Sequence, residues 1–150
     1  MMETDALIAG EESGGYAFRG HIPERDGVLS GLLLLDYMVR AGKKPSELLA
    51  DLYAEVGPHE YDRVDVTVRA EEKEAIRERV ATAEPSEIAG FAVESRDTLD
   101  GYRFRLEGGW WLLMRFSGTE PLLRIYAEMP SQDDVQAALH AGQELAGVTL

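Results

Sequence analysis

The sequence predicts an α+β protein: a C-terminal domain with an antiparallel sheet and helices on one side, preceded by a strand–helix–helix remnant of an α/β domain. The order of hydrophobic patterns supports this, because residues 58–150 show a strand, a helix, several strands and a closing helix. Residues 1–57 show one strand and two helices, too few to bury their own apolar surface. A helix-ending Gly-Pro pair separates the segments, so we expect domains at 1–57 and 58–150.

The first segment is expected to begin with a short strand at 6–9, which leads into a glycine-rich loop at 10–15. Asp26 can cap a helix predicted over 28–40, whose apolar residues lie around most of its circumference. We expect this helix to be buried on nearly all sides. A second helix is predicted from Ser46 to the Gly-Pro pair.

The second segment has the patterns of a domain that folds by itself. Valines alternate with charged and polar residues over 63–69, which is the period of a strand with one buried face. The charge-rich stretch 71–83 predicts an amphipathic helix. Ser131, with Asp134 three residues later, predicts the start of a closing helix. Further strands are expected at 91–95, 102–106, 110–116 and 122–128.

Composition excludes several classes of protein. The chain has no cysteine, which rules out disulfides, a thiol nucleophile and thiolate metal sites. Acidic residues outnumber basic ones 28 to 15, and the net charge of −13 makes nucleic acid and anionic membranes unexpected partners. The longest apolar run, 32–35, is too short to span a membrane, and the acidic N-terminus does not resemble a signal peptide, so we expect a cytoplasmic protein. The three histidines lack metal-ligand spacing, and no metal site is predicted.

The loop at 115–121 combines the groups that bind an oxyanion. Arg115 offers a planar fork of donors, and Ser117 and Thr119 offer hydroxyls. Gly118 allows consecutive backbone N–H groups to turn toward an anion. This combination predicts a loop that binds an oxyanion.

The charges around this loop leave two interpretations open. From residue 110 to 127 the only acid is Glu120, against Arg115 and Arg124, so a positive patch is expected in an acidic protein. The alternative is an ordinary strand–turn–strand unit in which both arginines pair with surface acids, since such ion pairs are common.

The glycine-rich loop offers a second candidate site. Glu11, Glu12 and Ser13 present carboxylates and a hydroxyl with little bulk beside them, which suits a polyol such as a sugar. The alternative is a connection whose glycines serve only its geometry, with solvated acids. Chelation of a cation by Glu11 and Glu12 ranks last, because adjacent side chains in an extended loop diverge.

Together, these segments resemble the α-D-phosphohexomutase family, the phosphoglucomutases and phosphomannomutases. The resemblance is carried by Gly10-Glu11-Glu12-Ser13-Gly14-Gly15, His21-Ile22-Pro23-Glu24-Arg25-Asp26-Gly27, Arg115-Phe116-Ser117-Gly118-Thr119-Glu120-Pro121 and Arg124-Ile125-Tyr126-Ala127-Glu128. It implies that 1–57 is the end of the sugar-binding third domain and that 58–150 is the phosphate-binding fourth domain. Some relatives have histidine where this chain has Gly15, so no role of that histidine is carried over.

The resemblance also implies a reaction and roles for individual residues. Family members move a phosphoryl group between O1 and O6 of a hexose through a bisphosphorylated intermediate that turns over in the site. The implied sugar-binding residues are Glu11, Ser13 and Arg25, and the implied phosphate-binding residues are Arg115, Ser117, Gly118, Thr119 and Arg124. These residues orient substrate and stabilise charge, and no catalytic residue is expected in this segment.

By the same resemblance, the catalytic serine and the Mg²⁺ site lie in upstream domains, which are expected partners. The chain is therefore expected to be a C-terminal fragment, inactive alone, of an intramolecular phosphotransferase that uses a glucose 1,6-bisphosphate-type intermediate. The alternative is a freestanding phosphosugar-binding or regulatory module without catalytic activity. The apolar helix at 28–40 is also expected to promote self-association of the fragment.

Overall fold

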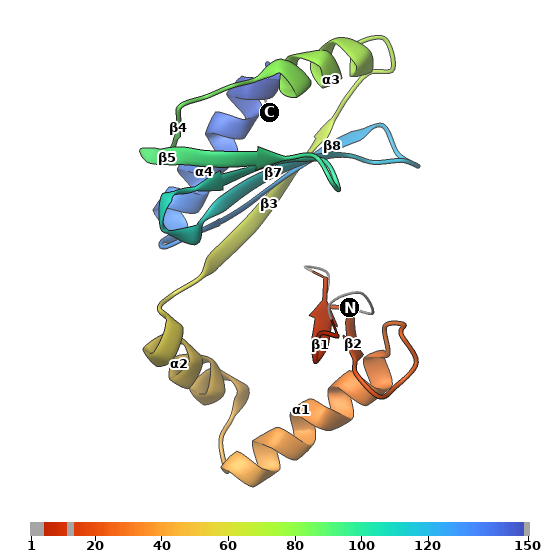
Figure 1. Ribbon diagram of the computed structural model, residues 1–150, viewed down its shortest axis with the longest axis vertical. Coiled ribbons are helices and arrows are strands. Elements are labelled where there is room, and N and C mark those ends of the chain that lie inside the picture. Colours follow the sequence, from red (N-terminus) through yellow and green to blue (C-terminus); the bar gives the residue numbers. More distant parts are fainter. Residues whose placement is uncertain (1–4, 12–13, 149–150) are drawn as a thin grey trace. The chain divides into compact units, whose positions relative to one another are not determined.

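The computed structural model describes residues 5–11 and 14–148. It divides into two compact units, Met1–Glu55 and Val56–Leu150, called here the N-terminal and C-terminal units. Figure 1 shows the elements of each unit along the chain.

The N-terminal unit begins with a β-hairpin, not with a lone strand. Strands β1 (Ile8–Gly10) and β2 (Tyr16–Phe18) pair antiparallel, with Ile8 opposite Phe18. The expectation of an unpaired strand was therefore wrong, because Tyr16–Phe18 is too short to show an alternating pattern and follows directly on glycines. The hairpin makes the glycine-rich segment the loop between two hydrogen-bonded strands.

Two helices follow, and local signals define their ends. Helix α1 (Gly27–Ala41) is capped by Asp26, whose side chain accepts the N–H of Leu29 at 2.9 Å. It ends at Gly42, which adopts the left-handed φ of 64°. Helix α2 (Pro45–Val56) follows. Both predicted helices are confirmed, with ends shifted by a residue or so.

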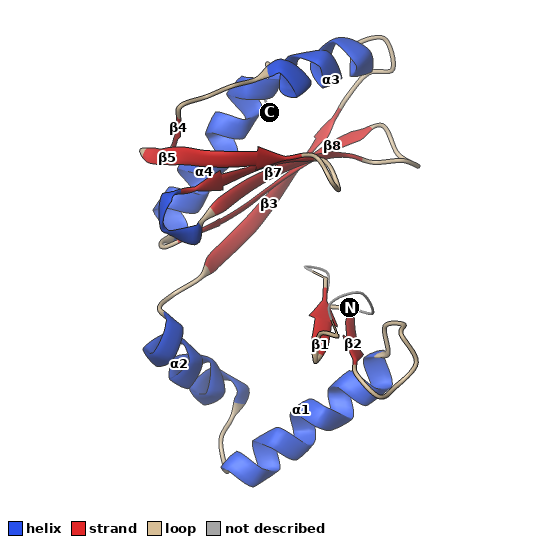
Figure 2. Ribbon diagram, viewed as in Figure 1, coloured by secondary structure: helices blue, strands red, loops and turns tan. Residues whose placement is uncertain are grey.

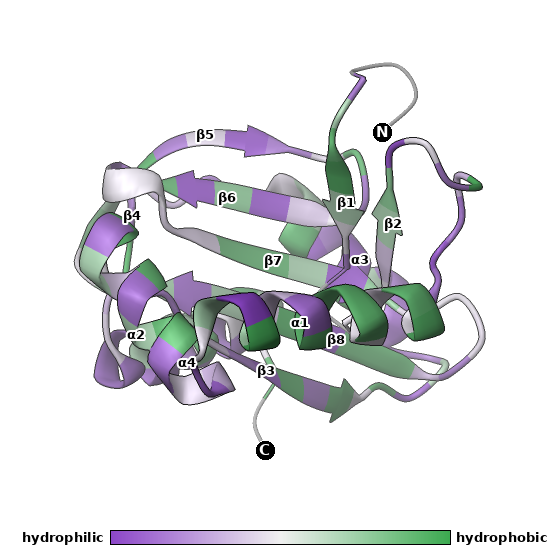
Figure 3. Cartoon of the chain, turned by 90° about the horizontal axis from the view of Figure 1, so that it is seen from below, coloured by the Kyte–Doolittle hydropathy of each residue, from purple (hydrophilic) through white to green (hydrophobic). Residues whose placement is uncertain are grey.

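The expected burial of the first helix is not observed. Neither α1 nor α2 contains a buried residue, and the Leu32 side chain is 59% exposed. Figure 3 shows that much of α1 is coloured as hydrophobic, and the large apolar residues of this helix, such as Val28, Leu32 and Leu35, are exposed. Among the described residues of this unit, Ala17 alone belongs to the buried hydrophobic set, because a hairpin and two helices supply too little surface to cover one another.

The C-terminal unit contains a six-stranded antiparallel sheet in the order β3-β8-β7-β6-β5-β4. Four strands expected after residue 90 and the valine strand before them are confirmed, and the two-residue β4 is an addition too short to predict. Between β6 and β7 lies a short 3-10 turn, Glu107–Gly109. The strands are β3 (Glu60–Thr67), β4 (Glu87–Ile88), β5 (Phe91–Asp97), β6 (Tyr102–Leu106), β7 (Trp111–Phe116) and β8 (Leu122–Met129).

Helices α3 (Lys73–Thr82) and α4 (Gln132–Ala146) lie on the same side of this sheet (Figure 2), as predicted. Ser131 caps α4 by accepting the N–H of Asp134 at 3.2 Å. One apolar core joins both helices to the sheet; its fully buried members include Val80, Phe104, Leu106, Leu112, Met114, Leu123, Ile125, Met129, Val135 and Ala138. The predicted fold class is thus confirmed.

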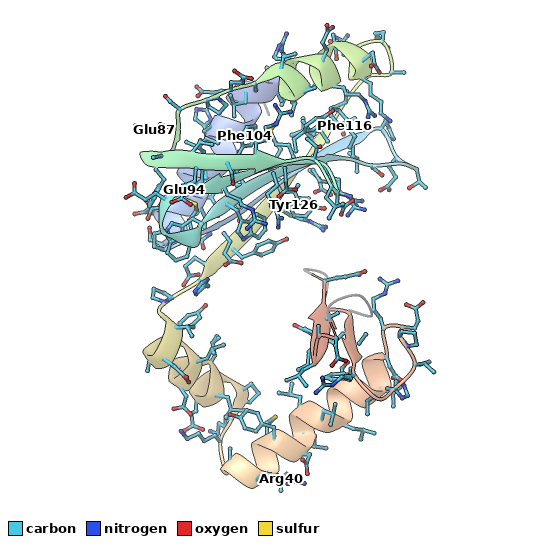
Figure 4. All side chains as sticks on the ribbon, in the orientation of Figure 1. Arg40, Glu87, Glu94, Phe104, Phe116 and Tyr126 are labelled. Atoms are coloured by element: carbon cyan, nitrogen blue, oxygen red, sulfur yellow. The ribbon has the colours of Figure 1, made fainter. Side chains whose placement is uncertain are left out.

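Side chains of each strand alternate between the helix-covered face and the opposite face of the sheet. On β8, Leu123 and Ile125 enter the core, whereas Arg124 and Tyr126 lie on the opposite face. Figure 4 labels Tyr126 and the core residue Phe104, which lie on opposite sides of the sheet. The loop that joins β7 to β8 carries the predicted residues Ser117, Gly118 and Thr119, whereas Arg115 lies near the end of β7 and Arg124 near the start of β8.

Candidate functional site

The loop between β7 and β8 is held closed by its own hydrogen bonds. The N–H of Ser117 donates to the carbonyl of Leu122 at 2.9 Å, and the N–H of Glu120 donates to the Ser117 hydroxyl oxygen at 3.1 Å. The carbonyl of Pro121 accepts the N–H of Val68 at 2.8 Å, which ties the loop to the segment after β3. Since the Ser117 oxygen accepts a bond, its hydroxyl proton remains available for donation to an anion.

The tip of this loop presents unused donors and open space. In the part of the chain that the structure describes, the backbone N–H groups of Gly118 and Thr119 make no hydrogen bond. A Cβ added at Gly118 would meet no atom within 4 Å, and this glycine is not among those with positive φ. Neither packing nor backbone conformation in this unit therefore requires glycine there, and the absent side chain leaves the loop open to a ligand.

Three segments surround a cavity of about 570 Å³ next to the loop. They are the start of the loop, the N-terminal half of α3 and the β5–β6 turn, which reach the same end of the sheet (Figure 1). The cavity is lined by Lys73, Arg77, Leu99, Asp100, Gly101, Arg115, Phe116, Ser117 and Gly118.

This cavity is cationic, with one acid against three basic side chains. Lys73 lies 3.5 Å from the Ser117 carbonyl oxygen, and Arg77 lies over the Phe116 ring at 4.9 Å from its centroid. Arg115 faces Asp100, with 3.4 Å between Nε and a carboxylate oxygen. The positive charge of the cavity thus comes from Arg115 and from two residues of α3, and not from the predicted pair of Arg115 with Arg124. An anion such as phosphate fits this charge.

Sequence reasoning missed the cationic wall that α3 supplies. Lys73 and Arg77 lie four apart and so share one face of the helix. That spacing was visible in the sequence, but the pairing of distant segments at one end of the sheet was not.

Arg124 takes a different position from Arg115, although the two residues are directly opposite in the pairing of β7 and β8. Its guanidinium bonds to Glu120 at 2.8 Å and lies 3.6 Å from Asp65, and it does not line the cavity. Arg124 thus stabilises the loop through Glu120. Both arginines pair with acids, as the alternative interpretation expected, and the cavity forms nonetheless. Thr119 is also outside the cavity lining.

In the hairpin loop of the N-terminal unit, Glu11 and Arg25 are brought together. The Arg25 guanidinium donates to the Glu11 carboxylate at 2.6 Å, and this partner raises the pKa of Arg25 above its ordinary value. A Cβ at Gly15 would lie 2.6 Å from Cδ of Arg25, so glycine here allows the arginine to cross the loop. Ser13 and Glu12, the other predicted groups, lie outside the described residues.

His21 and Asp26 continue this polar region. The His21 ring lies 3.0 Å from the Asp26 carboxylate, which also caps α1. The bond from the Leu29 N–H, followed by the contact with His21, holds the pKa of Asp26 below its ordinary value. The sugar-binding role of Glu11 and Arg25 stays a prediction, as does the phosphate-binding role of the β7–β8 loop.

Two features are absent from the described residues. Within residues 5–11 and 14–148, no group of three or more histidines and acids is placed to hold a metal ion. None of the described helices is both long and apolar enough to cross a membrane.

The two units match, in this order, two consecutive domains of one protein family. Residues 1–56 match the sequence profile of phosphoglucomutase/phosphomannomutase, alpha/beta/alpha domain III, and residues 64–141 match that of the C-terminal domain of the same enzymes. The chain belongs to the phosphoglucomutase/phosphomannomutase family, and the resemblance seen in its loops is confirmed.

Similar proteins extend this assignment. A phosphoglucomutase/phosphomannomutase of Thermococcus kodakarensis is 32% identical over 145 residues, covering 97% of this chain and 29% of that protein. A phosphoglucosamine mutase of Leuconostoc mesenteroides is 36% identical over 137 residues, covering 91% of this chain and 26% of that protein. The chain therefore spans less than a third of the length of these relatives.

A crystal structure shares the fold. A phosphoglucomutase/phosphomannomutase family protein from Burkholderia thailandensis superposes with a TM-score of 0.67 at 22% identity. The match covers 97% of this chain and 30% of that protein. At this level of identity the likeness concerns the fold alone.

Proposed function

We propose that this chain supplies the sugar-hydroxyl and phosphate contacts of a hexose phosphomutase. The reaction is an intramolecular phosphoryl transfer that interconverts hexose 1-phosphate and hexose 6-phosphate through a bisphosphate. The observation that supports this most directly is the cationic cavity beside the β7–β8 loop. Arg115, Ser117 and Gly118 line this open space, and the backbone N–H groups of Gly118 and Thr119 beside it make no hydrogen bond within the described residues.

In this proposal the C-terminal unit holds the phosphate that is not reacting. Arg115 provides the charged fork, the Ser117 hydroxyl and the free amides of Gly118 and Thr119 provide further donors, and Arg124 keeps the loop in place through Glu120. Such groups act by positioning and by offsetting charge, which are the main terms in phosphoryl transfer.

The N-terminal unit is proposed to bind sugar hydroxyls. The Glu11 carboxylate is an acceptor, and Arg25, fixed against it at 2.6 Å, is a donor beside it. A donor and an acceptor held side by side match the paired hydroxyl groups of a hexose. A relative named phosphoglucosamine mutase aligns with 91% of this chain, so the proposal does not choose among glucose, mannose and glucosamine phosphates.

The remaining parts of the reaction are proposed to lie in other domains of the protein. Because the described residues include no group of three or more histidines and acids placed to hold a metal ion, we propose that the Mg²⁺ ion implied by the family resemblance binds in those other domains. We also propose a cytoplasmic location, a hexose-bisphosphate intermediate, and no mutase activity of the isolated chain.

The proposal is tested by an NMR titration of the chain with glucose 1-phosphate. Amide signals of Ser117, Gly118 and Thr119 are expected to shift at about millimolar ligand, because exposed ion pairs at a single loop contribute little free energy. Arg115→Ala is expected to abolish these shifts.

The matched control is Arg105→Ala, which removes the same charge from an exposed β6 position outside the cavity. It should leave the titration unchanged. If both variants lose the amide shifts equally, the effect is a nonspecific one of charge. If the unmodified chain shows no shift up to tens of millimolar ligand, roughly the weakest affinity expected for one loop, the proposal is contradicted.

A further inference from the structure

The phosphate cavity contains one acid, and it lies against the residue most suited to bind an anion. Asp100 lines the cavity together with Lys73, Arg77 and Arg115. Its carboxylate oxygen is 3.4 Å from Nε of Arg115, and within the described residues neither side chain has another ion-pair partner. The acid therefore stands where an incoming anion would approach the guanidinium.

The backbone holds Asp100 close to Arg115. Asp100 belongs to the β5–β6 turn, and the pairing of Tyr102 with Met114 brings that turn beside the start of the phosphate loop. Gly101 has a φ of 117°, and a Cβ there would lie 2.7 Å from the Met114 carbonyl oxygen. A residue with a side chain at 101 would push the turn away, so the glycine keeps Asp100 close to Arg115.

The contact itself is loose. At 3.4 Å it exceeds normal hydrogen-bond length, and the Asp100 side chain is 70% exposed. The pair of Arg124 with Glu120 differs, because it is a 2.8 Å hydrogen bond outside the cavity. Asp100 can thus rotate into solvent without breaking a strong bond, whereas Glu120 is part of the loop's framework.

We propose that Asp100 is a built-in competitor for the phosphate site, which occupies Arg115 in the empty site and gives way to the phosphate of the substrate. This inference rests on the proposed function of the loop. The exchange replaces one anion by another at the same guanidinium, so Arg115 keeps a partner in both states. A phosphate dianion binds against the repulsion of the nearby carboxylate, and this repulsion weakens binding and speeds release.

Fast release has a use in the proposed reaction. A bisphosphorylated intermediate that turns over must leave this cavity with one phosphate and return with the other. A site built only of cations would hold either phosphate longer. Lys73 and Arg77 keep the net charge of the cavity positive while Asp100 limits its affinity.

The test is phosphate binding by the full chain and its Asp100→Asn variant. Asparagine keeps the turn preference and shape of aspartate but removes the charge. Binding of inorganic phosphate, followed through the amides of Gly118 and Thr119, should tighten about two- to fivefold, the range expected for an exposed ion pair. Weaker or unchanged binding in Asp100→Asn would overturn the proposal.

Glu107→Gln is the matched control. Glu107 is exposed at the opposite end of β6, so the substitution removes one negative charge without entering the cavity. Its effect on phosphate affinity measures the contribution of net charge alone. An increase equal to that of Asp100→Asn would show that Asp100 has no specific role.

A double-mutant cycle separates this inference from the proposed function. In the Arg115→Ala background, where phosphate binding is expected to be lost, Asp100→Asn should not restore it; recovery of binding there would show that Asp100 acts by charge repulsion alone and would overturn its role as a competitor at Arg115. If neither the unmodified chain nor Asp100→Asn binds phosphate, the proposed function fails. If the unmodified chain binds and Asp100→Asn binds no better, the function stands and the competitor is excluded.

Discussion

Helices α1 and α4 are built by the same local rules and have opposite environments. Each has 15 residues, an N-cap side chain that accepts the N–H three residues on, and a left-handed glycine at its end. Yet α1 has no buried residue, whereas α4 buries Val135, Ala138, Leu139, Gly142 and Ala146 against the sheet. Caps and end signals therefore fix where a helix begins and ends, and only a partner surface fixes what it buries.

The two units differ in the same way. In the C-terminal unit both helices share one core with the sheet. In the N-terminal unit the hairpin and two helices leave large apolar side chains on the surface, among them Val28, Leu32 and Leu35. Stability measurements should therefore respond strongly to changes in one unit and weakly to the same changes in the other.

The largest contrast is expected from one leucine substitution made in each unit. Leu112→Ala removes a fully buried side chain and should lower the free energy of unfolding by about 2–5 kcal/mol. Leu32→Ala, at a position 59% exposed, should change it by less than about 0.5 kcal/mol at concentrations where the chain is monomeric. Urea denaturation followed by circular dichroism measures both. A large loss from Leu32→Ala would mean that α1 is covered in solution.

Replacing a glycine within each of the two helices by alanine should change stability in opposite directions. A Cβ at Gly142 would lie 2.7 Å from Ile125, so Gly142→Ala should destabilise the C-terminal unit by about 1–3 kcal/mol. At Gly31 a Cβ would meet nothing within 4 Å, so Gly31→Ala should stabilise α1 by about 0.5–1 kcal/mol through helix propensity. Thermal unfolding and amide exchange would report both changes, and equal signs would break the comparison.

The exposed face of α1 should make the chain self-associate, because a large apolar patch favours a partner. Replacing Leu32 and Leu35 with glutamate should weaken this association about tenfold or more, as two apolar side chains leave the contact. Sedimentation velocity over a concentration series would measure it. The paired control, Ser30→Glu with Arg40→Gln, makes the same change of two negative units in the net charge of this helix without removing an apolar side chain. A monomer at high concentration, with α1 amides well protected from exchange, would rule out this expectation.

The smallest effect concerns the cap of α1. Since the hydrogen bond from Leu29 lowers the pKa of Asp26, the ionised carboxylate favours the folded helix. This stabilisation is present above the ordinary carboxyl pKa of about 4 and is lost as pH falls through the lowered value. Amide exchange of α1 between pH 6 and pH 2 should therefore increase at the acidic end beyond its intrinsic pH dependence. Asp26→Asn keeps the cap and should remove this acid-induced increase in exchange, whereas Asp36→Asn should leave it in place.

Much of the candidate site could be predicted from the sequence because its loops are local. Arg115, Ser117 and Gly118 lie within four residues, so their capacity to bind an anion can be inferred from the sequence without knowing which distant residues surround them. Glu11 and Arg25 were assigned to one function by resemblance, and the hairpin joins them in one ion pair. The second strand of that hairpin was missed because three residues show no period, and β4 was missed for the same reason.

The sequence by itself determined the caps, the ends of the helices and the alternation of the central strands, since these depend on contacts within a few residues. It also determined the family, through two loops whose residues are contiguous. Only the tertiary structure decided that Lys73, Asp100 and Arg115 share a cavity, and that α4 is buried while α1 is exposed. The reason is that strand pairing and core packing join residues far apart in the chain, and local patterns carry no information about which distant surfaces meet.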